Sequence, residues 1–422
     1  MFLLNVVPLF SHMCYDIPDM RIAFLKYGEN LGISRHATAL LEAFKRQGAE
    51  VQTLDLSEGE LQDRVNQLTE FSPTFVLDLN GSCVIFGERE GQKLPIFDVF
   101  GYVHVSLFTD EPLFHFPVLL DLQKSNNFLP VVTDLKYADS IKFLGHERGT
   151  FYITPFIDPF QMPEPSEEKD IDIVFLGPVV DPNILAQQAV QNLKESFVPY
   201  FFEVGEFLFR NPEAHLLYAS EYLFSMFNQS FQEEFLKWRQ ENPHDYLRLL
   251  NDISLYATAK KRWFMLSFLE GIDLKIVGVF EGELKEGHQH LSISDWTEAL
   301  ELIGKSYMTI LTFPHAVPTG IGFVPLEVAF MESAPFIDLR ATLPGFFAPD
   351  SEVISYMPLD RADIEEKVVY YLENLQEAKE IGKRAKERVL RGYGPEDRAS
   401  FLYQMFQDLL SQAQAVQQKT TD

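Results

Sequence analysis

Short apolar segments alternate with amphipathic segments along this chain, and this alternation limits the fold more than any other feature. "RIAFL" (21–25) has the length and composition of a buried strand. "SRHATALLEAFKRQG" (34–48) places its apolar residues on one helical face, with Ser34 as the expected N-cap and Gly48 as the expected end. Repeated strand–helix pairs predict an α/β fold in which helices cover both faces of a parallel sheet.

Further apolar runs continue the pattern through both halves of the chain. Each is short enough for a strand and is followed by polar or glycine-containing turn residues. The expected strands are 49–56, 74–81, 101–110, 129–134, 150–156, 172–177, 274–278, 308–313, 334–338 and 353–357, with helices at 361–391 and 396–413.

A proline-rich, acidic stretch at 157–172 interrupts the alternation and has the composition of a linker. We therefore expect two α/β domains. The expected parts are an N-terminal extension (1–19), a Rossmann-like domain (20–160), a linker (161–170), a second Rossmann-like domain (171–392) with a helical region (184–258), and a C-terminal segment (393–422).

The composition excludes several classes of partner. The formal net charge is −27, which would repel nucleic acid and anionic membrane surfaces. Only two cysteines occur, without metal-ligand spacing, so we expect no disulfide framework and a cytoplasmic location. No apolar run reaches the length of a transmembrane helix, and the N-terminal segment lacks the basic leader and cleavage site of a signal peptide.

The stretch "GIGFVPLEVAFMESAPFIDLRA" (320–341) raises the question of function. A glycine-containing loop enters a helix at Pro325, and the backbone N–H groups of Gly320 and Gly322 could bind phosphate oxygens there. Glu327 would lie beside them and could accept hydrogen bonds from two ribose hydroxyls. The alternative is a structural glutamate that serves the helix dipole or a capping box, although Val324 stands where a capping box needs Ser or Thr.

Residues 171–405 resemble the C-terminal half of GT-B glycosyltransferases, most closely the CgeB-like branch. The resemblance rests on the order and spacing of "IDIVFLGPV", "KKRWFML…GIDLKIVG", the stretch from "GIGFVPLEVAF" to "EVISY", and "AKEIGKRAKERVLRGYGPEDR". It implies a GT-B-like fold, in which two Rossmann-like domains face each other across a cleft. It also implies a helical elaboration in the second domain and a C-terminal helix that returns to the first.

The resemblance implies that the second domain binds a nucleotide-diphosphate sugar. In the family, a glutamate at the position of Glu327 holds the donor ribose, and a cation near Lys260 to Arg262, three residues that we expect to start a helix, neutralises the diphosphate. Arg262 is preferred because its fork suits bidentate phosphate contact, although a solvated basic face is the alternative. Many relatives have a second glutamate where this chain has Thr319. The donor-binding candidates are Gly177, Lys261, Arg262, His315, Thr319, Gly320, Gly322 and Glu327.

In the first half, "LFTDEPLFHF" (107–116) follows a strand and contains candidates for a catalytic base. Asp110 and His115 are the catalytic candidates, with Glu111 as a competitor. An Asx-turn would use Asp110 equally well. The "GENLG" loop (28–32) could face a ligand, but a plain tight turn explains it too.

No metal and no cofactor are expected. His288 and His290 in "EGHQH" lack a third ligand nearby, and we expect an exposed loop there. GT-B enzymes as a fold need no bound metal, because cations and helix dipoles carry the charge of the leaving group.

The resulting hypothesis is transfer of a sugar from a nucleotide-sugar to an acceptor, which is a glycan, a protein or a small molecule. One alternative is a non-catalytic binding or scaffold protein that kept the fold. Another is a nucleotide-sugar epimerase of the same fold.

Overall fold

The computed structural model describes residues 20–28, 31–89, 91–147 and 149–421. The chain divides into two compact units. Unit 1 comprises Met1–Gln161 and Gly394–Asp422, and unit 2 comprises Met162–Tyr393. The expected N-terminal extension at 1–19 lies outside the described residues. In the described part of the chain, no helix is long and apolar enough to cross a membrane.

Unit 1 is built on a six-stranded parallel sheet with the order β2-β1-β3-β6-β7-β8. A short antiparallel hairpin, β4–β5, lies outside this sheet and was not expected from the sequence. The strands are β1 (Arg21–Lys26), β2 (Glu50–Asp55), β3 (Phe75–Leu79), β4 (Phe86–Arg89), β5 (Gln92–Pro95), β6 (Val103–Phe108), β7 (Phe128–Val132) and β8 (Phe151–Tyr152).

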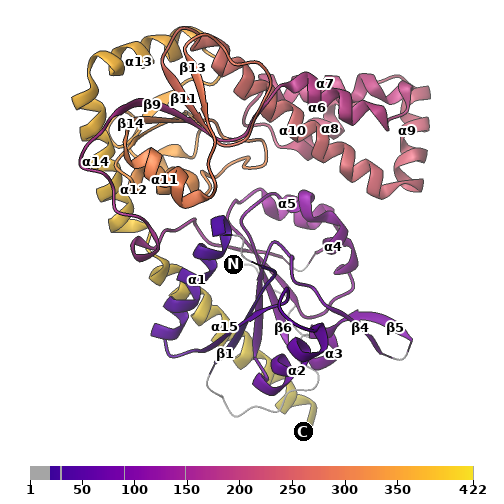
Figure 1. Ribbon diagram of the computed structural model, residues 1–422. Helices are drawn as coiled ribbons and strands as arrows, with labels where there is room; N and C mark the ends of the chain where they lie inside the picture. The colour runs from indigo at the N-terminus through magenta and orange to yellow at the C-terminus, as the bar shows by residue number, and fades with distance from the viewer. Residues whose placement is uncertain (1–19, 29–30, 90, 148, 422) are drawn as a thin grey trace. The chain divides into compact units, whose positions relative to one another are not determined.

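Helices cover both faces of this sheet (Figure 1). On one face, α2 and α3 bury Leu68 and Phe97 against Val76 of β3. On the other, α1 and α15 pack side by side. The helices of unit 1 are α1 (Leu31–Arg46), α2 (Leu61–Phe71), α3 (Ile96–Phe100), α4 (Phe116–Asp121), α5 (Tyr137–Phe143) and α15 (Pro395–Thr421).

Unit 2 contains a second six-stranded parallel sheet, with the order β13-β11-β9-β14-β15-β16. Its strand order reverses between β9 and β14, so that these neighbouring strands have connections that leave in opposite directions. The strands are β9 (Ile171–Leu176), β11 (Leu274–Val277), β13 (His288–Leu291), β14 (Ser306–Leu311), β15 (Ala334–Asp338) and β16 (Ile354–Tyr356); β10 (Val179–Val180) pairs separately with β12 (Phe280–Glu281).

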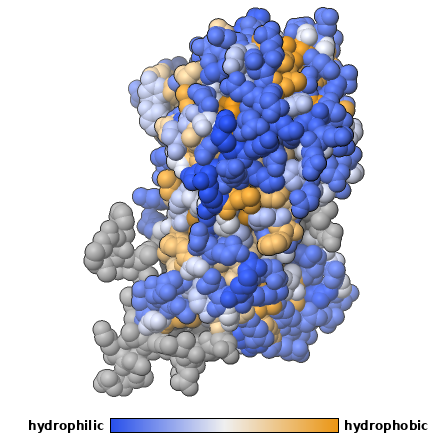
Figure 2. All heavy atoms as spheres, turned by 90° about the vertical axis from the view of Figure 1, so that its left-hand side faces the viewer, coloured by the Kyte–Doolittle hydropathy of each residue, from blue (hydrophilic) through white to orange (hydrophobic). Residues whose placement is uncertain are grey.

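The helical elaboration of unit 2 extends beside its sheet as α6 to α10 (Figure 1). Packed aromatic side chains, among them Phe197, Tyr200 and Phe235, fill its interior. The surface that carries α13 and α14 is mostly hydrophilic (Figure 2). The helices of unit 2 are α6 (Pro182–Gln191), α7 (Val198–Arg210), α8 (Leu216–Phe224), α9 (Gln229–Glu241), α10 (Pro243–Phe268), α11 (Trp296–Gly304), α12 (Val324–Phe330), α13 (Arg361–Glu373) and α14 (Leu375–Gly392).

Four local expectations are wrong. Helix α1 begins at Leu31, so Ser34 lies inside the helix and not at its N-cap. The helix expected at 361–391 is broken at Asn374, whose backbone leaves the helical region at φ −127° and ψ 49°. "EGHQH" is not an exposed loop, because it enters β13, which pairs with β11. The basic triplet 260–262 does not start a helix and lies near the end of the 26-residue helix α10.

The C-terminal helix completes the core of unit 1. The ring of Phe406 is fully buried and stacks on Phe75 of β3 with 4.1 Å between ring centroids. It also stacks on the ring of Phe44 of α1, with 5.9 Å between ring centroids. Arg398 adds polar contacts, since it donates to the Thr154 hydroxyl at 2.5 Å. A helix far away in the sequence therefore supplies part of the first sheet's hydrophobic cover.

Replacing Phe406 should destabilise unit 1. Phe406→Ala removes a fully buried ring, and we expect it to lower the free energy of unfolding by about 3–5 kcal/mol. Phe401→Ala on the same helix is the control, because its side chain is 50% exposed and should cost little. Denaturant titration of both variants checks this, and equal stability of the two would contradict the packing described here.

Candidate functional site

The candidate site of unit 2 lies at the carboxyl edge of its sheet, where the strand order reverses. β9 ends at Leu176 and is followed by Gly177, while β14 ends at Leu311 and is followed by Thr312. Open α/β sheets bind ligands outside the carboxyl ends of their strands at such a switch point. Two segments far apart in the sequence thus meet where a ligand is expected.

Arg262 of α10 joins these two segments. Its Nε donates to Thr312 Oγ1 at 3.1 Å, and its Nη1 donates to the carbonyl of Pro178 at 2.8 Å. The guanidinium also packs on Gly177: a Cβ placed there would lie 3.5 Å from the guanidinium carbon. Gly177 has φ 136°, a conformation that side chains rarely adopt, so glycine serves both the turn and the close approach.

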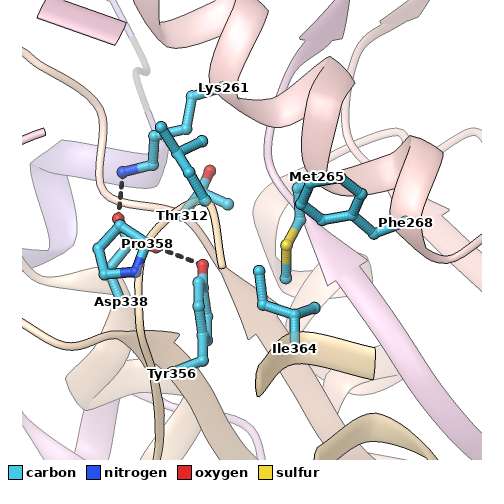
Figure 3. A pocket seen from close by; sticks show the side chains of 9 residues that line it. Lys261, Met265, Phe268, Thr312, Asp338, Tyr356, Pro358 and Ile364 are labelled. Atoms are coloured by element: carbon cyan, nitrogen blue, oxygen red, sulfur yellow. Dashed lines mark hydrogen bonds and ion pairs between the residues drawn. The ribbon is translucent and has the colours of Figure 1, made fainter. Parts of the chain in front are cut away.

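Lys261 directly precedes Arg262 in the sequence, but its ammonium points to Asp338 (Figure 3). Its ammonium forms an ion pair with Asp338, at the end of β15, and donates to the carbonyl of Phe313 at 2.9 Å. The Tyr356 hydroxyl donates to the other oxygen of Asp338. These groups line a cavity of about 10 Å³ together with Met265 and other apolar side chains. That volume is room for one water molecule and far too small for a nucleotide.

Arg340 is a further cation of this edge that the sequence analysis did not identify. Its Nη1 donates to the carbonyls of Val317 at 2.7 Å and Gly320 at 2.8 Å. Its guanidinium lies 3.9 Å from the centre of the Phe313 ring. Arg340 therefore shapes the glycine-containing loop. One signal was available in the sequence, because Arg340 lies two residues after the end of an expected strand.

Buried cations outnumber anions in this cluster. Lys261, Arg262 and Arg340 are all buried, and Asp338 is the anion that forms an ion pair with Lys261. Burial lowers the pKa of Lys261 below its usual range and the pKa of Arg262 to about 10. Burial and the charges of Lys261 and Arg340 lower the pKa of His315 to about 3, so this imidazole is neutral at pH 7. A local excess of positive charge of this kind favours an anionic ligand.

The loop from Thr312 to Phe323 is fixed by its neighbours. The N–H of His315 donates to Thr258 Oγ1 on α10 at 3.0 Å. The carbonyl of Thr319 accepts a hydrogen bond from the Thr342 hydroxyl. Gly322 adopts φ 64°, in the left-handed region that favours glycine. The loop thus enters α12 with a defined backbone conformation.

Glu327 occupies the first turn of α12 and is buried, with 1% of its surface exposed. Trp296, the first residue of α11, donates its indole N–H to Glu327 Oε2 at 3.0 Å. Glu327 is therefore bound on one oxygen by a side chain that the sequence analysis did not single out. A buried carboxylate at a helix start is a defined acceptor for hydroxyl groups of a ligand.

Lys260 differs from its two neighbours. It forms an ion pair with Glu206 of α7 and lies over the ring of Phe209 at 4.9 Å. Lys260 is partly exposed, whereas Lys261 and Arg262 are buried. The alternative of a solvated basic face is therefore excluded for Lys261 and Arg262. Lys260 belongs to the packing of the helical elaboration.

The candidate base of unit 1 lies after β6, at the carboxyl edge of that sheet. The Asp110 side chain is 44% exposed, and its Oδ2 lies 4.0 Å from Nε2 of His115, which is 28% exposed. Burial raises the pKa of Asp110 and lowers the pKa of His115. Asp110 Oδ1 also accepts from the N–H of the next residue, Glu111, at 2.8 Å; this is not an Asx-turn, because residue 112, where the donor N–H of an Asx-turn would lie, is a proline.

Two reciprocal hydrogen bonds tie this loop to the neighbouring strand. The N–H of Thr109 donates to Asn80 Oδ1 at 2.8 Å, and Asn80 Nδ2 donates to Thr109 Oγ1 at 3.2 Å. Asn80 has a positive φ of 55°, which Asn tolerates better than most residues. The ends of β3 and β6 are thereby held together beside Asp110.

Glu111 points into unit 1 instead of outward. It is 3% exposed and accepts from the N–H of Leu113 at 3.3 Å. Burial, together with the charges of Asp110 and Asp134, raises the pKa of Glu111 to about 8. The carboxyl group is therefore largely protonated at neutral pH and makes a poor competitor for the role of exposed base.

The remaining candidates have structural partners. In the "GENLG" loop, residues 29 and 30 lie outside the described part, and the N–H of Gly28 donates to Asp55 Oδ1 at 2.9 Å. Nε2 of His288 bonds the carbonyl of Leu269 at 2.9 Å, and Nε2 of His290 bonds that of Gly278 at 2.8 Å. Within the described residues, no three His, Cys, Asp or Glu side chains form a metal-binding group.

The raised pKa of Glu111 predicts pH-dependent stability. Between about pH 4.5 and 8 the folded state holds a proton on Glu111 that the unfolded state has lost, so raising the pH through this window lowers the free energy of unfolding. The stability contributed by protonated Glu111 is fully present below pH 4.5 and is lost by about pH 8. We expect a loss of up to about 1.4 kcal/mol per pH unit in this window. Glu111→Gln should flatten this slope in denaturant titrations, and a slope equal to that of the wild type would contradict the assignment.

Residues 260–404 match the family model described as glycosyl transferase-like. A protein of Aquifex aeolicus (strain VF5), described as uncharacterized, is 41% identical over 399 residues. This match covers 94% of the present chain and 99% of that protein.

Solved structures with low sequence identity are similar to this chain. One is an alpha-glucosyltransferase in complex with UDP and a 13-mer DNA, with 11% identity, a TM-score of 0.54, and 93% of this chain and 99% of that chain covered. A sucrose-phosphate synthase from Thermosynechococcus elongatus has 11% identity and a TM-score of 0.49, with 93% and 99% covered. The first likeness shows the GT-B fold, with its two Rossmann-like domains.

Proposed function

Since the chain belongs to the same family as the Aquifex aeolicus protein and contains a glycosyl transferase-like domain on a GT-B fold, we propose that it transfers a sugar from a nucleotide-diphosphate sugar to an acceptor hydroxyl. In this reaction the acceptor oxygen bonds to the anomeric carbon. The bond from that carbon to the diphosphate oxygen breaks, and the nucleoside diphosphate leaves with the electron pair. The acceptor proton passes to a base.

The observation that carries this proposal is the position of Arg262. Its guanidinium joins the loops after β9 and β14, at the switch point of unit 2, and packs on Gly177. A departing diphosphate develops negative charge that a fixed guanidinium stabilises. In a chain with a net charge of −27, three buried cations beside one ion-paired carboxylate at a ligand-binding edge favour an anionic ligand.

Within the proposed donor site, each candidate has a distinct role. Arg262 faces the diphosphate, Lys261 adds its positive charge from behind while Asp338 holds it, and the N–H groups of Gly320 and Gly322 bind phosphate oxygens. Glu327 accepts the hydrogen bonds of the ribose. No metal and no cofactor take part in this proposal, since cations supply the charge stabilisation.

The acceptor belongs to unit 1 in this proposal. Asp110 accepts the proton from the acceptor hydroxyl, and His115 lies 4.0 Å away to orient it or to take its place. The acceptor is not nucleic acid, because a chain of net charge −27 would repel phosphate backbones. We place the reaction in the cytoplasm and assign the chain to the CgeB-like branch on the motifs quoted above.

Donor binding tests the role of Arg262. Arg262→Met should weaken binding of a nucleoside diphosphate by about 1.5–3 kcal/mol, which is the range for a lost hydrogen bond to a charged group. Lys260→Met is the matched control, because this neighbouring cation pairs with Glu206 and should leave the affinity unchanged. Calorimetry with UDP, GDP, CDP and ADP supplies the measurement. An unchanged affinity in a folded Arg262→Met protein would refute the proposed site.

Turnover tests the base. Asp110→Asn should retain fold and donor binding while the rate of sugar transfer falls by roughly 100-fold or more, the usual scale for a lost general base. Rates of His115→Ala and Glu111→Gln complete the series. Normal turnover of Asp110→Asn beside an inactive His115→Ala would move the role of base to the histidine. Full activity of all three would show that the base lies elsewhere.

A further inference from the structure

The start of α11 is held by a reciprocal set of hydrogen bonds. The N–H of Glu298 donates to Asp295 Oδ1 at 3.0 Å, while the Glu298 carboxylate accepts from the N–H of Ser294 at 2.6 Å and from its hydroxyl at 2.9 Å. The arrangement is a variant of the capping box, because the Glu298 carboxylate reaches Ser294, one residue before the N-cap Asp295, and it fixes the backbone of the first helical turn. Trp296 is the first residue of that turn, so its backbone position is set before any ligand binds.

From this position the indole of Trp296 reaches Glu327. Nε1 donates to Glu327 Oε2 at 3.0 Å, across the contact between α11 and α12. The indole N–H is a donor only, so it prefers the ionised carboxylate, and a bond to a charged acceptor is about twice as strong as a neutral one. Glu327 is 1% exposed, so water competes little for this bond.

We propose that Trp296 is a positioning residue for Glu327: its indole N–H fixes the carboxylate in the orientation that accepts the ribose hydroxyls of the donor. The inference rests on the proposed function, because it assigns Trp296 to the same nucleotide site. A free glutamate side chain loses rotamer freedom when it binds a ligand, and a residue already held in one rotamer loses less. Trp296 therefore contributes to the affinity of the site for the ribose and does not take part in the chemical step.

The test compares two ligands in three proteins. Wild type, Trp296→Phe and Trp238→Phe are titrated with the ribonucleoside diphosphate that the wild type binds, chosen among UDP, GDP, CDP and ADP, and with its 2′,3′-dideoxy counterpart. Phenylalanine keeps an aromatic ring but lacks the N–H. Trp238 is the matched control because it lies in α9, where it packs on Phe197.

Trp296→Phe should bind the ribonucleotide about 10-fold more weakly, the scale of one lost hydrogen bond to a charged group. It should bind the dideoxy nucleotide as the wild type does, since no ribose hydroxyl remains to be positioned. Trp238→Phe should match the wild type with both ligands. Equal losses with both nucleotides, or a loss with neither, would overturn the inference.

A second measurement does not need a ligand. The chain has three tryptophans, so its nitrogen–proton NMR spectrum should contain three indole signals, and Trp296→Phe identifies one of them. Glu327→Gln should shift that signal, because the N–H then donates to a neutral amide. An unshifted signal would overturn the inference even if nucleotides bind.

The two proposals fail in different ways. If the wild type binds none of the four nucleoside diphosphates, the proposed function fails and the ribose role of Trp296 falls with it. If the wild type binds one of them, and Trp296→Phe discriminates ribose from dideoxyribose as well as the wild type does, only the inference about Trp296 fails.

Discussion

The contact on which the site of unit 2 depends is the bridge that Arg262 makes between the loops after β9 and β14. Parallel strands of this sheet end at one edge, but nothing in the sheet itself fixes the loops that follow them. Arg262 donates to Thr312 on one side and to Pro178 on the other, and Gly177 gives it room. Lys261 and Arg340 then fix the neighbouring backbone carbonyls. A single rigid edge results, lined with positive charge.

Most of the architecture could be predicted from the sequence, because strand length and helical periodicity are local properties. The predicted strands at 21–25, 172–177 and 334–338 are confirmed, and each differs from the observed strand by one residue or less at either end. The break at Asn374 was missed because the apolar pattern continues across it. β13 was missed because two histidines look polar, although their imidazoles bind backbone carbonyls beside the sheet.

The site was harder to predict, because its geometry depends on contacts between distant residues. Arg262 and Glu327 could be named from their motifs, whereas Trp296 and Arg340 carry no motif and show their roles only through the partners that they reach. The position of the basic triplet near the end of α10 was missed as well. The helical elaboration runs into this helix without a break, so no helix begins at residue 260. The periodicity of apolar residues predicts helices and strands, but it does not predict which side chains contact one another in the folded chain.

The contribution of α15 to unit 1 has a consequence for synthesis on the ribosome. Unit 2 comprises Met162–Tyr393 as one continuous stretch, so all of its residues have been made before α15 begins. Unit 1 starts earlier but lacks Phe406 until all of unit 2 has been translated, and Phe75 and Phe44 have no such cover before then. Domains generally fold as units, with the N-terminal one first. In this chain, unit 2 can complete its core before unit 1 does. The sheet of unit 1 stays without part of its hydrophobic cover until α15 has been synthesised.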